Sequence, residues 1–264
     1  DNDWWTQRAD MPGTVRNAAT GFPVGNKGYI TTGYNPDQKY LADTWEYDPE
    51  TNTWRQMDDF KGGARYYALG FGIDNYGYVG TGYNDNYLKD FYRFDPTAAA
   101  GSQWTIVNGF GGQKRQGGTA FVIDGKAYVC GGQNNNSDVS DFWRFDPSAA
   151  TPWTQLRDIA NTSDDDYDDD YTSIVRSYGV SFVIDGKAYL TLGSTAGGSY
   201  YSNYWIYDPE TDLWEGDDLT AFEGSTRIHA VCFSTGTRGI IATGGSGSSS
   251  YFDDTWELKD RKST

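Results

Sequence analysis

The chain has 264 residues, 33 of them glycine and 17% of them aromatic, with a formal net charge of −16 at pH 7. This length supports one globular domain with a substantial core. The negative charge repels phosphate backbones, and no apolar run approaches the length of a membrane span, so we expect neither a nucleic-acid partner nor a membrane-spanning segment.

Five tryptophans mark a repeat along the chain. Each precedes an arginine, and in the first three copies the two are 11 residues apart. From each arginine it is 17 residues to a glycine that ends an apolar run. The five sets are Trp5/Arg16/Gly33, Trp54/Arg65/Gly82, Trp104/Arg115/Gly132, Trp153/Arg176/Gly193 and Trp214/Arg227/Gly244. A period near 50 residues with several short strands per unit predicts a β-propeller.

Each repeat reads as four strands in chain order. The first follows the arginine and combines small and aromatic residues, as in Thr119–Ile123. An Asp-Gly turn supplies the positive φ of a hairpin, and the second strand ends on a glycine such as Gly132, where another backbone approaches closely. The third ends at Asp-Pro, since proline cannot continue a central ladder, and the fourth begins with the tryptophan. The small residues place the first strand innermost.

These elements predict an all-β, five-bladed propeller with four antiparallel strands per blade, in a single domain over residues 1–264. The blades are expected at residues 14–57, 63–107, 113–156, 174–215 and 225–258. The chain opens on a fourth strand and stops after a third, so we expect a strand at residues 3–8 to complete the last blade. Such closure would remove exposed sheet edges.

The glycine that closes strand two, the Asp-Pro after an aromatic strand, the following tryptophan and the opening arginine together resemble the kelch repeat of galactose oxidase-like propellers. Several copies lack the first glycine of the usual pair and have Thr32, Thr81 or Leu192 instead. Kelch propellers include copper oxidases, bacterial sialic acid mutarotases and many protein-binding modules, so the resemblance implies a fold without choosing a function.

Residue counts argue against a metallo-oxidase. The copper site that the resemblance implies needs two histidines, and the chain has one, His229, so we expect neither copper nor an ordinary zinc site. No Ser-His-Asp or Cys-His spacing supports nucleophilic catalysis. A packed or surface role for His229 is weighed against a role as catalytic base. Cys130 and Cys232 lie in repeats that are not neighbours and are expected to be buried free thiols.

The loops between the second and third strands are rich in Tyr, Asn and Gly and share a face with the arginines. Tyrosine with asparagine offers flat apolar area beside adaptable hydrogen bonding, although such loops are also ordinary solvent-exposed turns. The candidate ligand-binding residues at this face are Tyr34, Tyr83, Asn134, Tyr201, His229 and the arginines Arg16, Arg65, Arg115, Arg176 and Arg227. The arginines have two interpretations: recognition of a carboxylate ligand, or structural ties required in every blade.

An insertion between Trp153 and Arg176 contains the run SDDDYDDDY. Calcium is the natural cation for such carboxylates, with Asp164, Asp166, Asp168 and Asp170 as candidate ligands, although the run lacks the glycine and terminal glutamate of a helix-loop-helix calcium site. The alternatives are a solvated loop and an acidic flap that folds over the arginine face.

The sequence therefore favours a non-catalytic, monomeric binding module that recognises a glycan or a protein segment through the loop face. We expect it to be secreted, periplasmic or anchored at the outer surface, with any signal or anchor segment absent from this chain. The alternatives are a mutarotase or epimerase that acts on an acidic sugar, for which Glu223 is one candidate acid, and a structural scaffold without a small ligand.

Overall fold

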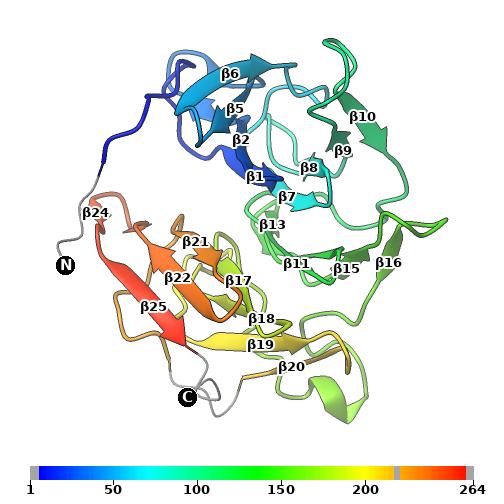
Figure 1. Ribbon diagram of the computed structural model, residues 1–264. Coiled ribbons are helices and arrows are strands. Elements are labelled where there is room, and N and C mark those ends of the chain that lie inside the picture. The colour runs from blue at the N-terminus through cyan, green and yellow to red at the C-terminus, as the bar shows by residue number, and fades with distance from the viewer. Residues whose placement is uncertain (1–5, 217–220, 260–264) are drawn as a thin grey trace.

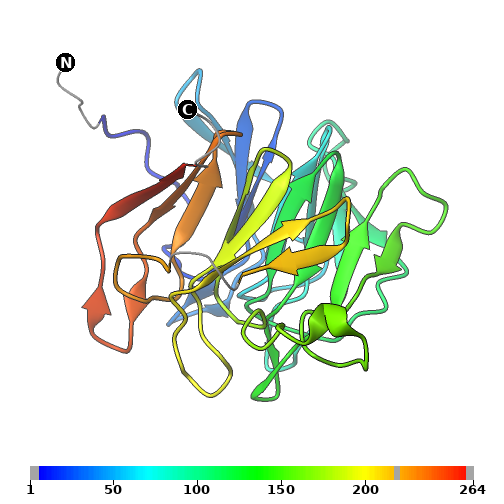
Figure 2. The same ribbon diagram turned by 90° about the horizontal axis from the view of Figure 1, so that it is seen from below.

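A computed structural model describes residues 6–216 and 221–259 of the chain. Short antiparallel sheets are arranged around a central axis (Figure 1), and the structure is that of a five-bladed, all-β propeller, as predicted. Figure 2 shows the same ring turned by 90°, with longer loops on one side of it. No helix in the described part of the chain is long and apolar enough to cross a membrane.

Four blades have four strands each, in antiparallel order. Blade 1 consists of β1 (Thr20–Val24), β2 (Lys27–Thr31), β5 (Thr44–Asp48) and β6 (Thr53–Met57). Blade 2 consists of β7 (Leu69–Ile73), β8 (Tyr76–Gly80), β9 (Phe91–Phe94) and β10 (Trp104–Val107). Blade 3 consists of β11 (Thr119–Ile123), β12 (Lys126–Cys130), β15 (Phe142–Phe145) and β16 (Trp153–Gln155). Blade 4 consists of β17 (Val180–Ile184), β18 (Lys187–Thr191), β19 (Tyr204–Asp208) and β20 (Leu213–Glu215).

Blade 5 has three strands among the described residues: β21 (Val231–Ser234), β22 (Arg238–Ala242) and β25 (Thr255–Lys259). Loops between second and third strands carry the two-residue hairpins β3 (Tyr34–Asn35) with β4 (Lys39–Tyr40), β13 (Gln133–Asn134) with β14 (Ser137–Asp138), and β23 (Gly245–Ser246) with β24 (Ser250–Tyr251). The described residues also contain one 3-10 turn, η1 (Asp166–Asp168).

The predicted closing strand at 3–8 is not formed by the residues that can be described. Residues 1–5 lie outside the described residues, and residues 6–8 are in no strand. The chain that follows is held by blade 1, because Ala9 accepts a hydrogen bond from Trp54 Nε1 at 2.8 Å and donates one to Asn52 Oδ1 at 2.9 Å. Closure by residues 3–5 stays a prediction.

Consecutive blades share one repeated apolar interface. A phenylalanine of the first strand stacks on a tyrosine of the second at ring-centroid distances of 5.3–5.7 Å. The pairs are Phe22/Tyr29, Phe71/Tyr78, Phe121/Tyr128 and Phe182/Tyr189. In the first three interfaces, a third-strand aromatic and the fourth-strand tryptophan of the next blade join the same cluster, as Phe94 and Trp104 do beside Phe22. Aromatic burial of this kind supplies most of the packing between blades.

A backbone hydrogen bond links each blade to the next at the end of the second strand. The glycine amide donates to the carbonyl of the next arginine at 2.8–2.9 Å, in the pairs Gly33/Arg65, Gly82/Arg115, Gly132/Arg176 and Gly193/Arg227. A Cβ added to Gly33 would lie 2.9 Å from the carbonyl oxygen of Asn17, so the close approach requires glycine. The preceding residue is also left-handed in every blade, including Thr32 at φ 63° and Leu192 at φ 59°. The missing first glycines are thus replaced by residues held in the same conformation.

The arginine side chains lock the blades from within. Arg65 is 1% exposed, and its guanidinium binds both carboxylate oxygens of Asp90, at 2.5 and 2.9 Å, and the carbonyl of Thr81 at 2.9 Å. The same pairing joins Arg16 to Asp43, Arg115 to Asp141 and Arg227 to Asp254. The bonds connect the start of the first strand with the start of the third, within one blade.

Replacing Arg65 with alanine should therefore destabilise the fold. Arg65→Ala leaves Asp90 and several carbonyls without their donor, which we expect to lower the free energy of unfolding by about 3 kcal/mol and the melting temperature by roughly 6 °C or more. Arg55→Ala is the matched control, because the Arg55 side chain is 61% exposed and its ion pair with Glu46 is partly solvated. Thermal melts of both variants test this, and equal midpoints would contradict the structural role of Arg65.

Candidate functional site

The five arginines do not present their charge at the loop face. The side chains of Arg16, Arg65, Arg115 and Arg227 are 0–4% exposed and each pairs with an aspartate of its own blade. A ligand carboxylate would have to displace that aspartate to reach them. Of the two interpretations of the arginines, these four pairs support structural ties within each blade, and recognition of a carboxylate ligand stays a prediction.

Arg176 differs because its partner is an amide. Its guanidinium donates to Asn203 Oδ1 at 3.0 Å and to the carbonyls of Ser173 and Leu192 at 2.7 and 3.0 Å, and it has no carboxylate partner among the described residues. The ring of Tyr201 lies over it at 4.6 Å. Burial lowers the pKa of Arg176 to about 10, so the group stays charged at neutral pH. The predicted ligand residue Tyr201 thus covers a buried cation.

Six tyrosines form a continuous aromatic surface on the loops of blades 1 and 2. We call it the tyrosine surface; its members are Tyr34, Tyr40, Tyr66, Tyr67, Tyr83 and Tyr87, all of them partly exposed. Tyr66 lies at its centre, with ring centroids 5.7 Å from Tyr34, 5.6 Å from Tyr40, 4.6 Å from Tyr67 and 5.8 Å from Tyr83. Backbone bonds between Tyr66 and Tyr83, at 3.0 and 3.1 Å, fix the two loops to each other.

The tyrosine surface continues to the centre of the ring through a second aromatic group. Tyr67 stacks on His229 at 5.1 Å with planes 16° apart, and both rings contact Tyr178 at 4.8 Å. Gln116 and Gln133 donate hydrogen bonds to the Tyr178 hydroxyl at 2.8 and 2.7 Å. Blades 2, 4 and 5 thus meet at the axis through three rings.

These central residues occupy one repeated position, the second after each arginine. All five have a left-handed backbone: Ala18 at φ 52°, Tyr67 at 52°, Gly117 at 64°, Tyr178 at 57° and His229 at 60°. Bulky residues adopt this conformation at a cost, and they persist there only where the surrounding structure holds them. In three of the five blades this position carries an aromatic side chain, and these three rings contact one another at the axis.

The hydroxyls of Tyr40, Tyr66, Tyr67 and Tyr178 remain protonated at physiological pH. Burial and a 2.8 Å hydrogen bond to Asp85 raise the pKa of Tyr40 to about 12, and burial raises the pKa of Tyr67 to about 12. Burial also raises the pKa of Tyr66 and Tyr178. The surface thus combines flat apolar rings with neutral hydroxyls that donate and accept hydrogen bonds.

Sequence reasoning named three residues of these two aromatic groups and missed the others. Tyr34 and Tyr83 belong to the tyrosine surface, and His229 belongs to the central group. Asn134 lies in the β13–β14 hairpin, where its backbone pairs with that of Ser137, and it is not a member of the tyrosine surface. Residues that were not predicted include Tyr40, Tyr66, Tyr67, Tyr87, Tyr178, Gln116 and Gln133. The overlooked signal is the pair of positions directly after each arginine.

The acidic insertion forms neither a calcium site nor a flap over the mouth. Asp168 is buried and accepts hydrogen bonds from the amides of Thr162 and Ser163 at 3.0 and 3.2 Å. Tyr171 anchors the segment to blade 4, because its hydroxyl accepts the amide of Trp214 at 2.7 Å. Figure 1 places this segment at the periphery of the ring, beyond β20.

No three Asp, Glu, His or Cys side chains converge as a metal site within residues 6–216 and 221–259. The predicted ligand set of Asp164, Asp166, Asp168 and Asp170 is therefore not assembled, because Asp168 turns inward to cap its own loop while the other three are exposed. Cys130 and Cys232 are free thiols, one buried and the other half-buried, and burial raises the pKa of both.

The fold and its aromatic mouth define a β-propeller with a pre-formed loop-face surface. The kelch-motif family model matches residues 23–61 and 114–156. The solved structure of YjhT superimposes with a TM-score of 0.78 at 15% identity, over 98% of this chain and 86% of that one, which shows the fold alone. The fold is a β-propeller, and two segments of the chain match the kelch motif, as the sequence predicted.

Curated relatives are similar over parts of the chain. N-acetylneuraminate epimerase of Yersinia pestis (strain Pestoides F) is 28% identical over 164 residues, 51% of this chain and 41% of that protein. The same-named protein of Shigella sonnei is 31% identical over 108 residues, 39% of this chain and 26% of that protein. An F-box/kelch-repeat protein of Arabidopsis thaliana is 29% identical over 96 residues, 35% and 17% of the two. The chain thus spans less than half the length of these relatives.

The central histidine gives a pH prediction. His229 keeps part of its surface open to solvent, but the tyrosine rings bury the rest, and this burial lowers its pKa below the usual 6.5. A lowered folded-state pKa means that the unfolded chain binds the proton more readily. Stability is therefore full above about pH 6.5 and is lost as pH falls through the lower, folded pKa.

We expect the melting temperature of the wild type to fall more steeply between pH 7 and pH 5 than that of His229→Gln. Melts at closely spaced pH values measure both slopes, with Tyr251→Phe as a control far from the axis. Parallel slopes for wild type and His229→Gln would show that the imidazole is not desolvated at the axis.

Proposed function

We propose that this propeller is a non-catalytic binding module that recognises a neutral glycan through the tyrosine surface. The observation that supports it most is the contiguity of six partly exposed tyrosines on three backbone-linked loops. Rigid aromatic rings stack on the apolar faces of sugars, and their hydroxyls bind sugar hydroxyls, at little cost in side-chain entropy.

The charge of the protein supports a neutral rather than an acidic ligand for this surface. The net charge of −16 disfavours anions, and the mouth offers them no exposed arginine, because four of the five are neutralised by aspartates. Asp85 lies at the edge of the surface on the Tyr40 hydroxyl, where a carboxylate can accept further bonds from sugar hydroxyls. Such a module would act as a monomer outside the cytoplasm, as a secreted, periplasmic or surface-anchored protein.

Binding should depend on the centre of the tyrosine surface. An array of neutral oligosaccharides identifies the ligand, and calorimetry then compares wild type with Tyr66→Ala and Tyr83→Ala. Each variant removes one aromatic contact worth about 1 kcal/mol or more, so we expect affinity to fall about tenfold. Tyr251→Ala is the matched control, because Tyr251 is 82% exposed on blade 5 and lies outside the surface.

Retained affinity in Tyr66→Ala and Tyr83→Ala, with folding confirmed by thermal melts, would contradict recognition at this surface. Binding of peptides but of no glycan would reassign the same surface to a protein segment. If neither class binds, the aromatic mouth is part of a structural scaffold, in which the three central rings act as a plug.

A second candidate, an epimerase or mutarotase that acts on an acidic sugar, is supported by Arg176. This buried cation has no carboxylate partner among the described residues, so a sugar carboxylate could supply one if Tyr201 moved aside. The similarity to proteins named N-acetylneuraminate epimerase points in the same direction. Glu223, which the sequence offered as a candidate acid for this activity, is exposed.

The epimerase is tested with N-acetylneuraminate dissolved freshly as a single anomer. On this hypothesis the protein speeds the approach to anomeric equilibrium, followed by proton NMR, and Arg176→Gln abolishes the effect while Tyr66→Ala does not. Tyr201→Phe keeps the covering ring and serves as a folding control. An unchanged equilibration rate with wild-type protein would rule out this activity and leave the glycan-binding proposal untouched.

A further inference from the structure

The blades are not evenly distributed around the axis. Figure 1 shows the space between blade 5 and blade 1 to be wider than the space between any two consecutive blades. The first strands β1, β7, β11, β17 and β21 contact one another in that order, whereas β21 and β1 make no comparable contact. We call this interval between blade 5 and blade 1 the seam.

The seam lacks the backbone bond that joins the other blades. In four places the glycine at the end of strand two donates to the carbonyl of the next blade's arginine, as Gly193 does to Arg227 at 2.9 Å. The remaining donor and acceptor are the Gly244 amide and the Arg16 carbonyl. Both residues are described, and no such bond connects them.

On the side that faces the seam, blade 1 has an unfilled position for an aromatic side chain, which we call the seat. At the equivalent position of the next blade, a Cβ added to Gly77 would lie 2.1 Å from the ring of Phe22, and one added to Gly239 in blade 5 would lie 2.1 Å from Phe182. The corresponding glycine of blade 1 is Gly28, and an added Cβ there would meet nothing within 4 Å. No phenylalanine of a preceding blade therefore fills the space beside Gly28.

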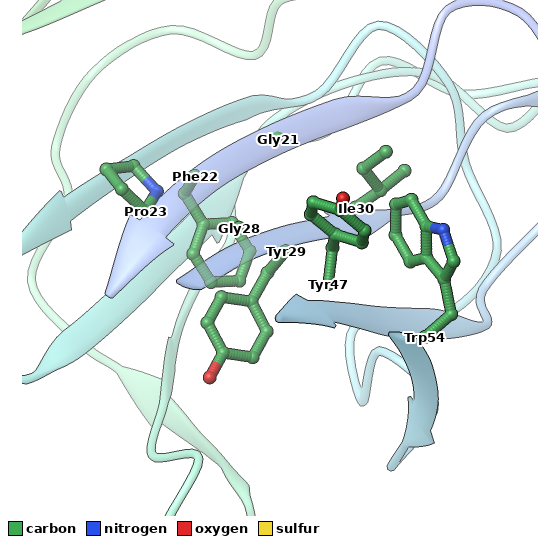
Figure 3. Close-up of a pocket in the computed structure, with 8 residues that line it drawn as sticks. All are labelled: Gly21, Phe22, Pro23, Gly28, Tyr29, Ile30, Tyr47 and Trp54. Carbon is green, nitrogen blue, oxygen red and sulfur yellow. The ribbon is translucent and has the colours of Figure 1, made fainter. Parts of the chain in front are cut away.

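The empty seat is part of a hollow of about 370 Å³ on the outer face of β1 and β2. Figure 3 shows its lining, in which Pro23 and Ile30 accompany the rings of Tyr47 and Trp54, whose centroids are 4.9 Å apart. These residues occupy the places that Gly72, Val79, Phe94 and Trp104 fill in blade 2, where they pack against blade 1. The lining is thus half of a standard blade interface.

Blade 5 presents the other half. Phe233, which occupies the position of Phe22, is 57% exposed, whereas Phe22, Phe71, Phe121 and Phe182 are 4–5% exposed. Val231 beside it on β21 is 55% exposed. Val231 and Phe233 thus form a continuous apolar face on the innermost strand of blade 5, and no neighbouring blade covers this face.

The N-terminal segment shows what kind of partner belongs there. In blade 2, Trp104 Nε1 donates at 3.0 Å to the carbonyl of Asp58, the residue that follows the last strand of blade 1. In blade 1, Trp54 Nε1 donates in the same way to Ala9 at 2.8 Å. Ala9 therefore lies where a preceding blade ends, although blade 5 does not reach that place.

We propose that the seam is the docking site of one further kelch-type blade. Its first-strand aromatic would occupy the seat at Gly28, and an arginine carbonyl at its start would accept the Gly244 amide. Its third-strand aromatic would cover Phe233. A blade that carries both halves of the interface would cover both faces at once. Each half follows the pattern of the existing interfaces, three of which contain the full aromatic set.

The chain supplies its own probe for this test. A copy of residues 113–148, which holds the first three strands of blade 3, is joined after residue 264, so that the fourth place stays open to the N-terminal segment. We expect the melting temperature to rise by about 5 °C or more and hydrogen exchange of the Gly244 amide to slow about tenfold or more. The control carries Phe121→Asp and Phe145→Asp in the appended copy, which removes the aromatic contacts to both faces. Equal melting temperatures for the two extended proteins would overturn the proposal.

Measurements on the 264-residue chain distinguish a further blade from two alternatives at the seam, direct closure of the ring and a second copy of the chain. Direct closure of blade 5 on blade 1 would bring Gly21 against Val231, as Gly70 meets Thr20 in the first interface. We expect Gly21→Cys with Val231→Cys, in a Cys232→Ser background, to form no intramolecular disulfide on oxidation, and quantitative formation would overturn the proposal. Sedimentation should show a monomer, and a dimer abolished by Phe233→Asp would assign the seam to a second copy instead.

Discussion

The arginine that opens each blade is the constraint on which the rest of the architecture depends. Its side chain is buried against the start of the third strand, on an aspartate in four of the five blades, and in blades 2 to 5 its carbonyl accepts the amide of the preceding blade's glycine. One residue therefore fixes the strand order within a blade and the distance between blades. Taking such a charge out of water is costly, and the carboxylate with two or three carbonyls offsets that cost only when all of them are in place. This explains why the arginine recurs while its neighbours vary.

The repetition has a physical consequence at the ends of the array. Each blade has two different faces. One carries the phenylalanine of the first strand, which stacks on a tyrosine in blades 1 to 4, and the other carries the side chains of strands three and four. An internal blade buries both faces, but the first and last blades each keep one exposed, as Phe233 does. In a repeat protein with nearest-neighbour contacts, stability is lost at such ends unless they are closed or capped. The seam is therefore the least stabilised part of the ring.

Much of the fold could be predicted because its determinants are local in sequence. The spacing from Trp54 to Arg65 and on to Gly82 contains a strand end, a loop and a hairpin, and each imposes its own residue type. The site could not be predicted in this way. Tyr67, Tyr178 and His229 lie in three repeats and meet only when the ring forms, so no spacing between them is informative. The burial of the arginines could not be predicted either. An arginine can bind a ligand or stabilise the fold, and only its pairing with an aspartate of the same blade distinguishes the two roles.

The division between fixed and variable positions explains how this scaffold supports recognition. The arginine fixes its own backbone, and the next two residues are then held beside the mouth, the second with positive φ in every blade. Because packing elsewhere holds that geometry, the side chains at these two positions can change without loss of the fold. Here they are Tyr66 and Tyr67 in blade 2 and Gln116 and Gly117 in blade 3. Aromatic rings on such a base lose little entropy on binding, since the backbone is already ordered. The tyrosine surface is thus concentrated where three adjacent loops all carry tyrosines, on the side of the loop face formed by blades 1 and 2.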